Sequence, residues 1–364
     1  MSDFDLDEIM SVIDEALGDS PTTAKSEIKT KPLETTVFET TDWETTEWPN
    51  VLRRMVNAQE VFGKGVPAVG LAQYDGFRAA GYEHLDVPTV PTVYEPCLTA
   101  LGSLVLSCAT GLKTMLVGDT GTGKTSLAEY FAAKLGRPFA RIQFDEFMDD
   151  QKLVGSLEVR GTGDGGSETY FNKSELVRAM AYPSVACMDE FSRGPSHVTM
   201  LANPILDRGS VTVTTHDDSA SSKVQAVDDF FICATDNTNG TGDDMDLYNS
   251  SNVLDEAIRN RFDLYERVPY PSESVEREII KQFTKGKLDD ELVKQLAHFS
   301  AMCHKGYTDR KIRTAFSIRN LKAISELMLQ GVSVKDAIRF NFYNRVSKSE
   351  QPDIAEVVRS IFGE

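Results

Sequence analysis

The sequence contains few residues of the kinds that form disulfides or bind transition metals. Its 364 residues include five cysteines with no Cys-x-x-Cys pair, and its five histidines are scattered without the spacing of a zinc or cobalt site. Two of the cysteines fall inside apolar runs that are typical of buried strands. We therefore expect free, reduced cysteines, as in intracellular proteins.

The sequence also lacks long apolar runs and basic runs. No stretch approaches the roughly 18 apolar residues of a membrane span, and the first ten residues, MSDFDLDEIM, are acidic where a signal peptide would be basic. The 38 Lys and Arg against 56 Asp and Glu give a net charge of -18, which repels nucleic acid unless a basic patch compensates. These features predict a cytoplasmic protein without a membrane partner, and they weigh against a nucleic-acid partner.

Acidic residues are concentrated at the amino terminus. Residues 1–50 hold 13 Asp or Glu against three Lys, together with nine Thr. Residues 3–17 place apolar side chains near helical spacing, which predicts a short amphipathic helix, whereas residues 18–50 carry too little apolar surface to fold. We expect residues 1–50 to be an acidic, largely disordered extension, unless the short helix is a docking peptide for a partner.

Three further segments follow. Residues 51–96 are expected to form an N-terminal helix, from a helix-like piece at 50–61, and a linker punctuated by prolines. In residues 97–271, short apolar runs alternate with helical segments, which predicts a parallel sheet covered on both faces. After Pro271 only helical periodicity remains, so residues 272–364 are expected to be all-helical. The predicted strands are 115–117, 139–144, 185–188, 230–235 and 264–268.

One octapeptide predicts a phosphate site. Residues 118–125, GDTGTGKT, match G-x-x-x-x-G-K-[ST] between a predicted strand and a predicted helix. The glycines let backbone amides face phosphate oxygens, Lys124 adds a positive charge, and the Thr125 hydroxyl can bind Mg²⁺. The expected cofactors are ATP and Mg²⁺. The expected nucleotide-binding residues are Gly118, Asp119, Thr120, Gly121, Thr122, Gly123, Lys124, Thr125 and Ser126.

An acidic pair ends the predicted strand VACM. Asp189 would hold Mg²⁺ through its water shell, as the second metal-site residue beside Thr125. Glu190 would polarise the attacking water, because phosphoryl transfer needs an aligned nucleophile more than covalent help. The pair therefore predicts ATP hydrolysis and not ATP binding alone.

Together these residues resemble the AAA+ ATPases, in particular the MoxR-type branch with an insert in its second helix, and within it the ATPase subunits of aerobic cobaltochelatases, the CobS type. The resemblance runs from about Val87 to the carboxyl terminus. It includes ICATDNTNGTGDDMDLY, which is similar to the family's A-T-x-N-T-x-G-x-G-D stretch. The resemblance implies an α/β fold, with an AAA+ P-loop domain containing a parallel sheet and a C-terminal all-helical lid domain.

The resemblance also implies roles for residues outside the two phosphate motifs. Asn237 matches the sensor 1 residue that orients the attacking water, although an Asn here could simply cap a turn. Arg261 matches the arginine finger that reaches the neighbouring subunit's γ-phosphate, with Arg259 as the second candidate; a surface arginine favoured by the helix dipole is the alternative. Arg319 matches the sensor 2 arginine, although Ile318 stands where the family has proline.

Two segments alternate like hairpins. Residues 152–176 contain a formal G-x-G-x-x-G, but the pattern does not open a helix, so we do not expect a dinucleotide site. In the family this segment is the helix-2 insert, which faces the ring pore or a partner. Residues 209–227 resemble the pre-sensor hairpin of the same branch. For both segments, a purely structural role as a cover over the domain is an equally good interpretation.

The resemblance finally implies assembly and partners. Active sites between protomers predict a self-associated ring, a homohexamer, that works on another protein. The implied partners are a protein with an integrin-like metal-binding domain and a protein client. The alternatives are the ATPase motor subunit of a cobalt-inserting chelatase and a DNA-dependent AAA+ motor.

Overall fold

The computed structural model describes residues 39–82, 86–163, 165–213, 223–238, 240 and 252–363. All of them lie within one compact unit, residues 37–364. The helix predicted at 3–17 and most of the glycine- and aspartate-rich loop after Asn237 lie outside the described residues.

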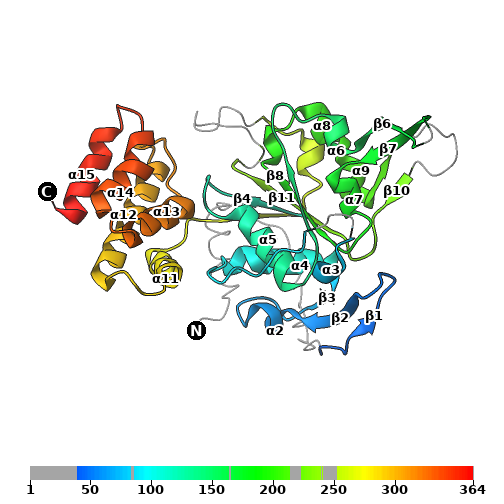
Figure 1. Cartoon of the computed structure of the whole chain (residues 1–364), viewed down its shortest axis with the longest axis horizontal. Coiled ribbons are helices and arrows are strands. Elements are labelled where there is room, and N and C mark those ends of the chain that lie inside the picture. The colour runs from blue at the N-terminus through cyan, green and yellow to red at the C-terminus, as the bar shows by residue number, and fades with distance from the viewer. Residues whose placement is uncertain are drawn as a thin grey trace, which may run out of the picture. The chain divides into compact units, whose positions relative to one another are not determined.

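A five-stranded parallel sheet forms the centre of the fold (Figure 1). Its strands coincide with the five predicted apolar runs. Because three of them are buried along most or all of their length, both faces of the sheet are covered, as predicted. In spatial order the strands are β12 (Leu264–Arg267), β4 (Thr114–Val117), β11 (Phe231–Asp236), β8 (Val185–Asp189) and β5 (Phe139–Gln143).

Each face of the sheet has its own apolar core. Successive residues of β4 alternate between them: Leu116 packs with α4 (Leu98–Thr110) and α5 (Lys124–Lys134), whereas Met115 packs on the opposite face. The opposite core also includes residues of shorter helices, namely α6 (Asp150–Leu153), α7 (Glu175–Ala179), η2 (Phe191–Arg193), α8 (Ser196–Leu201), α9 (Asn203–Arg208) and α10 (Glu256–Arg259). The predicted α/β parallel-sheet fold is confirmed.

The expectation of a helix at 50–61 is wrong for its first half. Residues 52–57 form β2 (Leu52–Asn57), which pairs with β1 (Glu44–Thr45) and β3 (Gly70–Asp75) in an antiparallel sheet, and only α2 (Ala58–Phe62) is helical. The six residues of β2 pair residue by residue with β3, whose partnership is not visible in the local pattern. Asn57 then accepts a hydrogen bond from the Gln59 amide and starts α2. A second short helix, α3 (Phe77–Ala80), follows β3.

A buried arginine joins this antiparallel sheet to the central domain. Arg137 donates to the Ala72 carbonyl from Nε (3.1 Å) and Nη2 (2.9 Å), and to the Asp229 carbonyl from Nη1 (2.9 Å). The Asp229 carboxylate in turn accepts hydrogen bonds from Arg53 (2.8 Å) and Tyr74. Burial opposes ionisation of Asp229, but these two bonds outweigh it and hold the pKa of Asp229 below its ordinary value.

Replacing Arg137 with methionine is expected to lower the free energy of unfolding by about 3 kcal/mol, because the buried Ala72 carbonyl and the partly buried Asp229 carbonyl lose a charged donor. Denaturant-induced unfolding followed by circular dichroism measures the change. Arg160→Met is the matched control: Arg160 pairs with Glu168 on the surface, and its loss should cost less than about 1 kcal/mol. Equal losses in both variants would contradict the structural role of Arg137.

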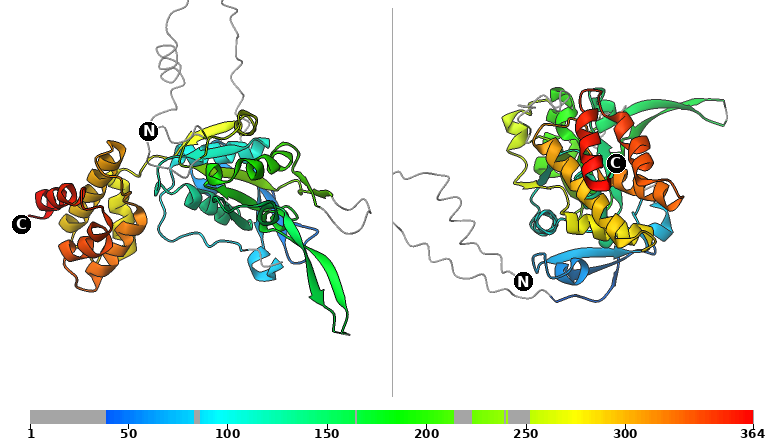
Figure 2. Two further views of the ribbon diagram at one scale, coloured as in Figure 1. Left: turned by 90° about the horizontal axis from the view of Figure 1, so that it is seen from above. Right: turned by 90° about the vertical axis from the view of Figure 1, so that its left-hand side faces the viewer.

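Both predicted hairpins are present. Strands β6 (Gly155–Gly161) and β7 (Ser167–Lys173) pair along their whole length, and Figure 2 shows this ribbon extending away from the central sheet. Strands β9 (Ser210–Thr212) and β10 (Lys223–Gln225) form the shorter hairpin, and residues 214–222 of its connection lie outside the described ranges. The formal G-x-G-x-x-G spans the end of β6 and the following turn, so it opens no helix.

The described residues after Pro271 form helices and no strand, as predicted for residues 272–364. Edge-to-face contacts of Phe316 with Phe299 and Phe342 hold a separate apolar core. The helices are α11 (Glu273–Thr284), α12 (Asp290–Thr308), α13 (Ile318–Leu329), α14 (Val334–Asn341), η4 (Tyr343–Arg345) and α15 (Gln351–Phe362). Across the part of the chain that the structure describes, no helix combines the length and apolar character needed to cross a membrane.

Candidate active site

The phosphate-site octapeptide forms a tight loop between β4 and α5. Gly121 and Gly123 adopt φ of 91° and 92°, which favour glycine. Gly118 is required for a different reason: a Cβ there would lie 2.3 Å from the Val268 carbonyl oxygen. The glycine spacing therefore serves both the turn of the loop and a close approach of the chain that follows β12.

Lys124 lies buried at the start of α5. Its ammonium donates to the carbonyls of Gly118 (2.6 Å) and Asp119 (3.0 Å) and to Oδ1 of Asn237 (2.9 Å). Burial lowers the pKa of Lys124 to about 8, although nearby carboxylates such as Asp189 oppose the shift. A bound polyanion such as a nucleoside triphosphate would stabilise the protonated, charged form of Lys124 and raise its pKa again. The hydrogen bond from Lys124 to Asn237 also places Asn237 beside the phosphate loop, as a sensor 1 role would require.

Asp189 is the buried last residue of β8 and connects three elements. Its Oδ1 accepts from the hydroxyls of Thr125 (2.6 Å) and Thr235 (2.5 Å), and its Oδ2 accepts from Arg141 Nε (2.7 Å). The two residues predicted to hold a metal are thus in direct contact. A hydroxyl and a carboxylate are the hard oxygen donors that suit Mg²⁺ bound together with nucleotide phosphates, so the donor set fits this ion.

Glu190 is held in an uncommon backbone conformation beside Asp189. Its φ of 55° and ψ of 46° are left-handed, and its amide donates to the Thr235 hydroxyl (3.1 Å). Its carboxylate Oε2 accepts from Arg193 (2.6 Å) and Gln143 (3.0 Å). Such outliers are found at functional sites when the surrounding structure compels them.

Asn237 is fixed from behind by its neighbour. The carboxylate of the buried Asp236 accepts hydrogen bonds from the backbone amide of Asn237 (2.8 Å) and from the Ser192 hydroxyl (2.6 Å). Burial raises the pKa of Asp236 above its ordinary value. Asp236 therefore positions the residue predicted as sensor 1, although sequence reasoning did not single it out.

A cavity of about 970 Å³ collects most of the predicted site residues. A cavity of this volume is large enough to hold a nucleotide. The lining includes Arg319 from the helical domain, so this predicted residue does reach the site. The other predicted residues in the lining are Thr120, Gly121, Thr122, Gly123, Lys124, Thr125, Ser126, Asp189, Glu190 and Asn237.

The two candidate finger arginines are not part of that lining. Arg261 Nε lies 2.9 Å from Oδ1 of Asp207 in α9, and Arg259 pairs with Glu256 one turn earlier. The structure therefore does not bring either arginine into the cavity of its own chain.

Sequence reasoning missed three partners of the acidic pair: Arg141, Gln143 and Arg193. Arg141 and Gln143 lie in β5, which neighbours β8 in the parallel sheet. Because the carboxyl ends of parallel strands meet at one edge, polar residues late in a predicted strand were the available signal.

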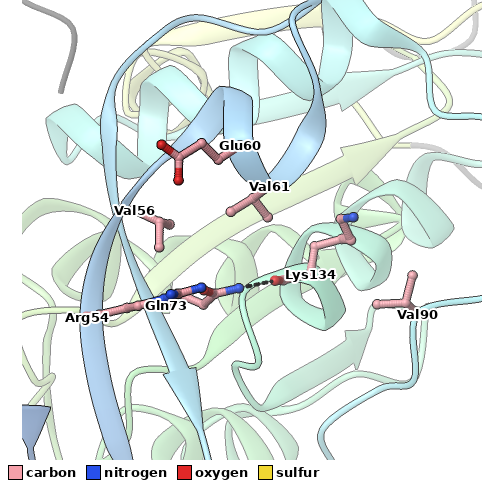
Figure 3. A pocket seen from close by; sticks show the side chains of 7 residues that line it. All are labelled: Arg54, Val56, Glu60, Val61, Gln73, Val90 and Lys134. Carbon is pink, nitrogen blue, oxygen red and sulfur yellow. Dashed lines mark hydrogen bonds between the residues drawn. The ribbon is translucent and has the colours of Figure 1, made fainter. Parts of the chain in front are cut away.

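A smaller cavity of about 430 Å³ lies beside the antiparallel sheet (Figure 3). Gln73 accepts hydrogen bonds from Arg54 and donates to the Lys134 carbonyl (3.0 Å), so polar groups of this cavity bond to one another. It contains none of the predicted site residues. The larger cavity is the candidate active site.

The chain is similar to several known proteins. Residues 113–262 match the family model of the AAA domain, dynein-related subfamily. Aerobic cobaltochelatase subunit CobS of Sinorhizobium sp. is 25% identical over 254 residues, which cover 69% of this chain and 75% of that protein. Midasin of Dictyostelium discoideum is 31% identical over 148 residues, 41% of this chain and 2% of midasin. Among solved structures, the RuvB Holliday junction branch migration motor of Thermotoga maritima has a TM-score of 0.41 at 15% identity, covering 72% of this chain and 74% of RuvB.

Proposed function

We propose that this chain, whose residues 113–262 form an AAA+ ATPase domain of the dynein-related subfamily, hydrolyses ATP at the interfaces of a homohexameric ring and thereby remodels a partner protein. One observation carries the proposal. Lys124, Asp189 and Glu190 line one cavity, whereas Arg261 of the same chain lies outside its lining, beside Asp207. A site that needs this arginine can be completed only by a second subunit.

Phosphate binding, Mg²⁺ binding and activation of the attacking water are assigned to different residues of the cavity. The loop and Lys124 hold the phosphates. Thr125 and Asp189 would hold Mg²⁺, which neutralises phosphate charge when it is bound. Glu190 polarises the attacking water and Asn237 orients it.

Two residues reach the phosphates from elsewhere. Arg319 enters the cavity from the helical domain and would contact the phosphates there. Arg261 would enter from the neighbouring subunit and stabilise charge in the transition state.

The similarity to CobS supports a partner with an integrin-like metal-binding domain, which would connect the ring to a protein client. The same similarity favours a second candidate function, the ATPase motor subunit of a cobalt-inserting chelatase. The two differ only in the client: a large chelating subunit in one, an unrelated protein in the other. The net charge of -18 counts against the DNA-dependent motor.

Capture of the partner tests this proposal. Glu190→Gln, which should bind ATP without hydrolysing it, is incubated with ATP in native lysate, and co-purified proteins are identified by mass spectrometry. We expect a protein with an integrin-like metal-binding domain, recovered with its client. Lys124→Ala, which cannot hold the phosphates, is the matched control and should recover neither.

The identity of the client then separates the two candidates, since a large chelatase subunit would establish cobalt insertion. Recovery of no ATP-dependent protein, together with salt-dependent stimulation of hydrolysis by DNA, would overturn the proposal in favour of the DNA motor.

A further inference from the structure

The segment between β12 and α11 is anchored to the phosphate-binding loop. The Val268 amide donates to the Val117 carbonyl (2.7 Å), at the residue before the loop. Pro269 and Pro271 then flank Tyr270 and restrict the backbone on both sides of it. Tyr270 is therefore held at a fixed place beside the loop.

Tyr270 contacts both the loop and the helical domain. Its hydroxyl donates to the Thr120 carbonyl (2.9 Å), and its ring stacks on His304 of α12, with centroids 3.9 Å apart and planes 11° from parallel. Burial raises the pKa of the Tyr270 hydroxyl, so it remains a donor at neutral pH. One side chain thus connects the phosphate loop to α12.

His304 passes this contact to the start of α13. Its Nε2 lies 3.1 Å from the Phe316 carbonyl oxygen, which can only accept, so Nε2 carries the proton. Burial lowers the pKa of His304 to about 4, so the ring is neutral at pH 7. Glu276 faces its other nitrogen, Nδ1, at 3.9 Å and accepts from Ser300 (2.9 Å).

Helix α13 begins against the phosphate loop. Phe316 precedes Ser317, the N-cap of α13, and Arg319 is the second residue of that helix. A Cβ on Gly121 would lie 2.7 Å from Cβ of Ser317, so the loop and the helix start are in close contact. Phe316 therefore lies where the start of α13, which carries Arg319, meets the phosphate loop.

We propose that Tyr270 is a positioning residue that, through His304 and Phe316, holds the start of α13 so that Arg319 reaches the nucleotide phosphates. This inference rests on the proposed ATPase function. Tyr270 itself also lines the cavity, so its role as a positioning residue must be distinguished from a direct contact with the nucleotide.

A double-mutant cycle tests the inference. Tyr270→Ala, Arg319→Ala and the double variant are compared by KM and kcat for ATP and by the dissociation rate of a fluorescent ATP analogue. Tyr270→Ala should raise KM about tenfold, as expected when one charge-assisted phosphate contact is lost. Because both changes remove the same contact, the double variant should be no more impaired than Arg319→Ala.

Two further variants separate positioning from general damage. Tyr270→Phe keeps the ring on His304 and should retain most of the coupling to Arg319. Tyr343→Ala removes another aromatic ring of the helical domain, away from the cavity lining, and should leave KM unchanged.

Three results would overturn the inference: additive losses in the cycle, an unchanged KM in Tyr270→Ala, or equal impairment of Tyr270→Phe and Tyr270→Ala. Failure of the proposed function would look different. In that case Lys124→Ala would bind and hydrolyse ATP as well as the unaltered protein does.

Discussion

Glu190→Gln is expected to lower steady-state ATP hydrolysis by about 10²–10⁴-fold while ATP binding is retained. The amide oxygen can still accept the hydrogen bonds that Arg193 and Gln143 now donate to the carboxylate. The amide cannot draw a proton from the attacking water, so the nucleophile is no longer activated. Phosphate release measures the first effect, and equilibrium binding of a fluorescent ATP analogue measures the second.

Two comparisons make this prediction specific to Glu190. Glu146→Gln makes the same chemical change at an exposed residue in the loop after β5 and should leave hydrolysis unchanged. Lys124→Ala should lose both hydrolysis and tight binding, because Lys124 holds the phosphates. Hydrolysis by Glu190→Gln within a few-fold of the unaltered protein would assign the general base elsewhere.

The local pattern predicted the centre of this site well. The loop at 118–125, the five parallel strands and the acidic pair after β8 depend on short-range signals: apolar runs, glycine spacing and residues at strand ends. The contact between Thr125 and Asp189 then follows, because β4 and β8 flank β11 in the parallel sheet and their carboxyl ends lie at the same edge.

Long-range partners were the part that the sequence could not supply. Strand β2 exists because β3 pairs with it, and Arg137 is tolerated in the interior because Ala72 and Asp229 present carbonyls to it. Each of these partners is distant in the sequence from the residue it stabilises, beyond the reach of one helical turn or a tight two-residue hairpin. A periodicity that looked helical at 50–61 was therefore overridden by tertiary pairing.

The role of Arg261 also depends on a distant partner that the sequence could not supply. Arg261 follows the short helix α10, and its guanidinium lies beside Asp207, with 27% of the side chain exposed. Its proposed target is a phosphate on another copy of the chain. No pattern or contact within one chain supplies that target, so the role must be tested on assemblies.

Arg261→Ala is expected to lower ATP hydrolysis by about 10³-fold or more while ATP affinity is retained. The lost guanidinium would have stabilised charge that develops only in the transition state, and it would have come from the neighbouring subunit. Phosphate release at several protein concentrations measures the effect. Arg259→Ala is the matched control, because Arg259 lies two residues away and pairs with Glu256; a larger loss there would move the finger to Arg259.

Mixing two inactive variants separates a shared site from a site within one chain. Arg261→Ala subunits keep an intact phosphate site, and Lys124→Ala subunits keep an intact Arg261. In mixed rings at equal amounts, about a quarter of the interfaces would combine the two intact halves and regain hydrolysis. If each variant stays inactive after mixing, or if hydrolysis by the unaltered protein does not depend on concentration and survives Arg261→Ala, then each chain hydrolyses ATP alone and the ring proposal fails.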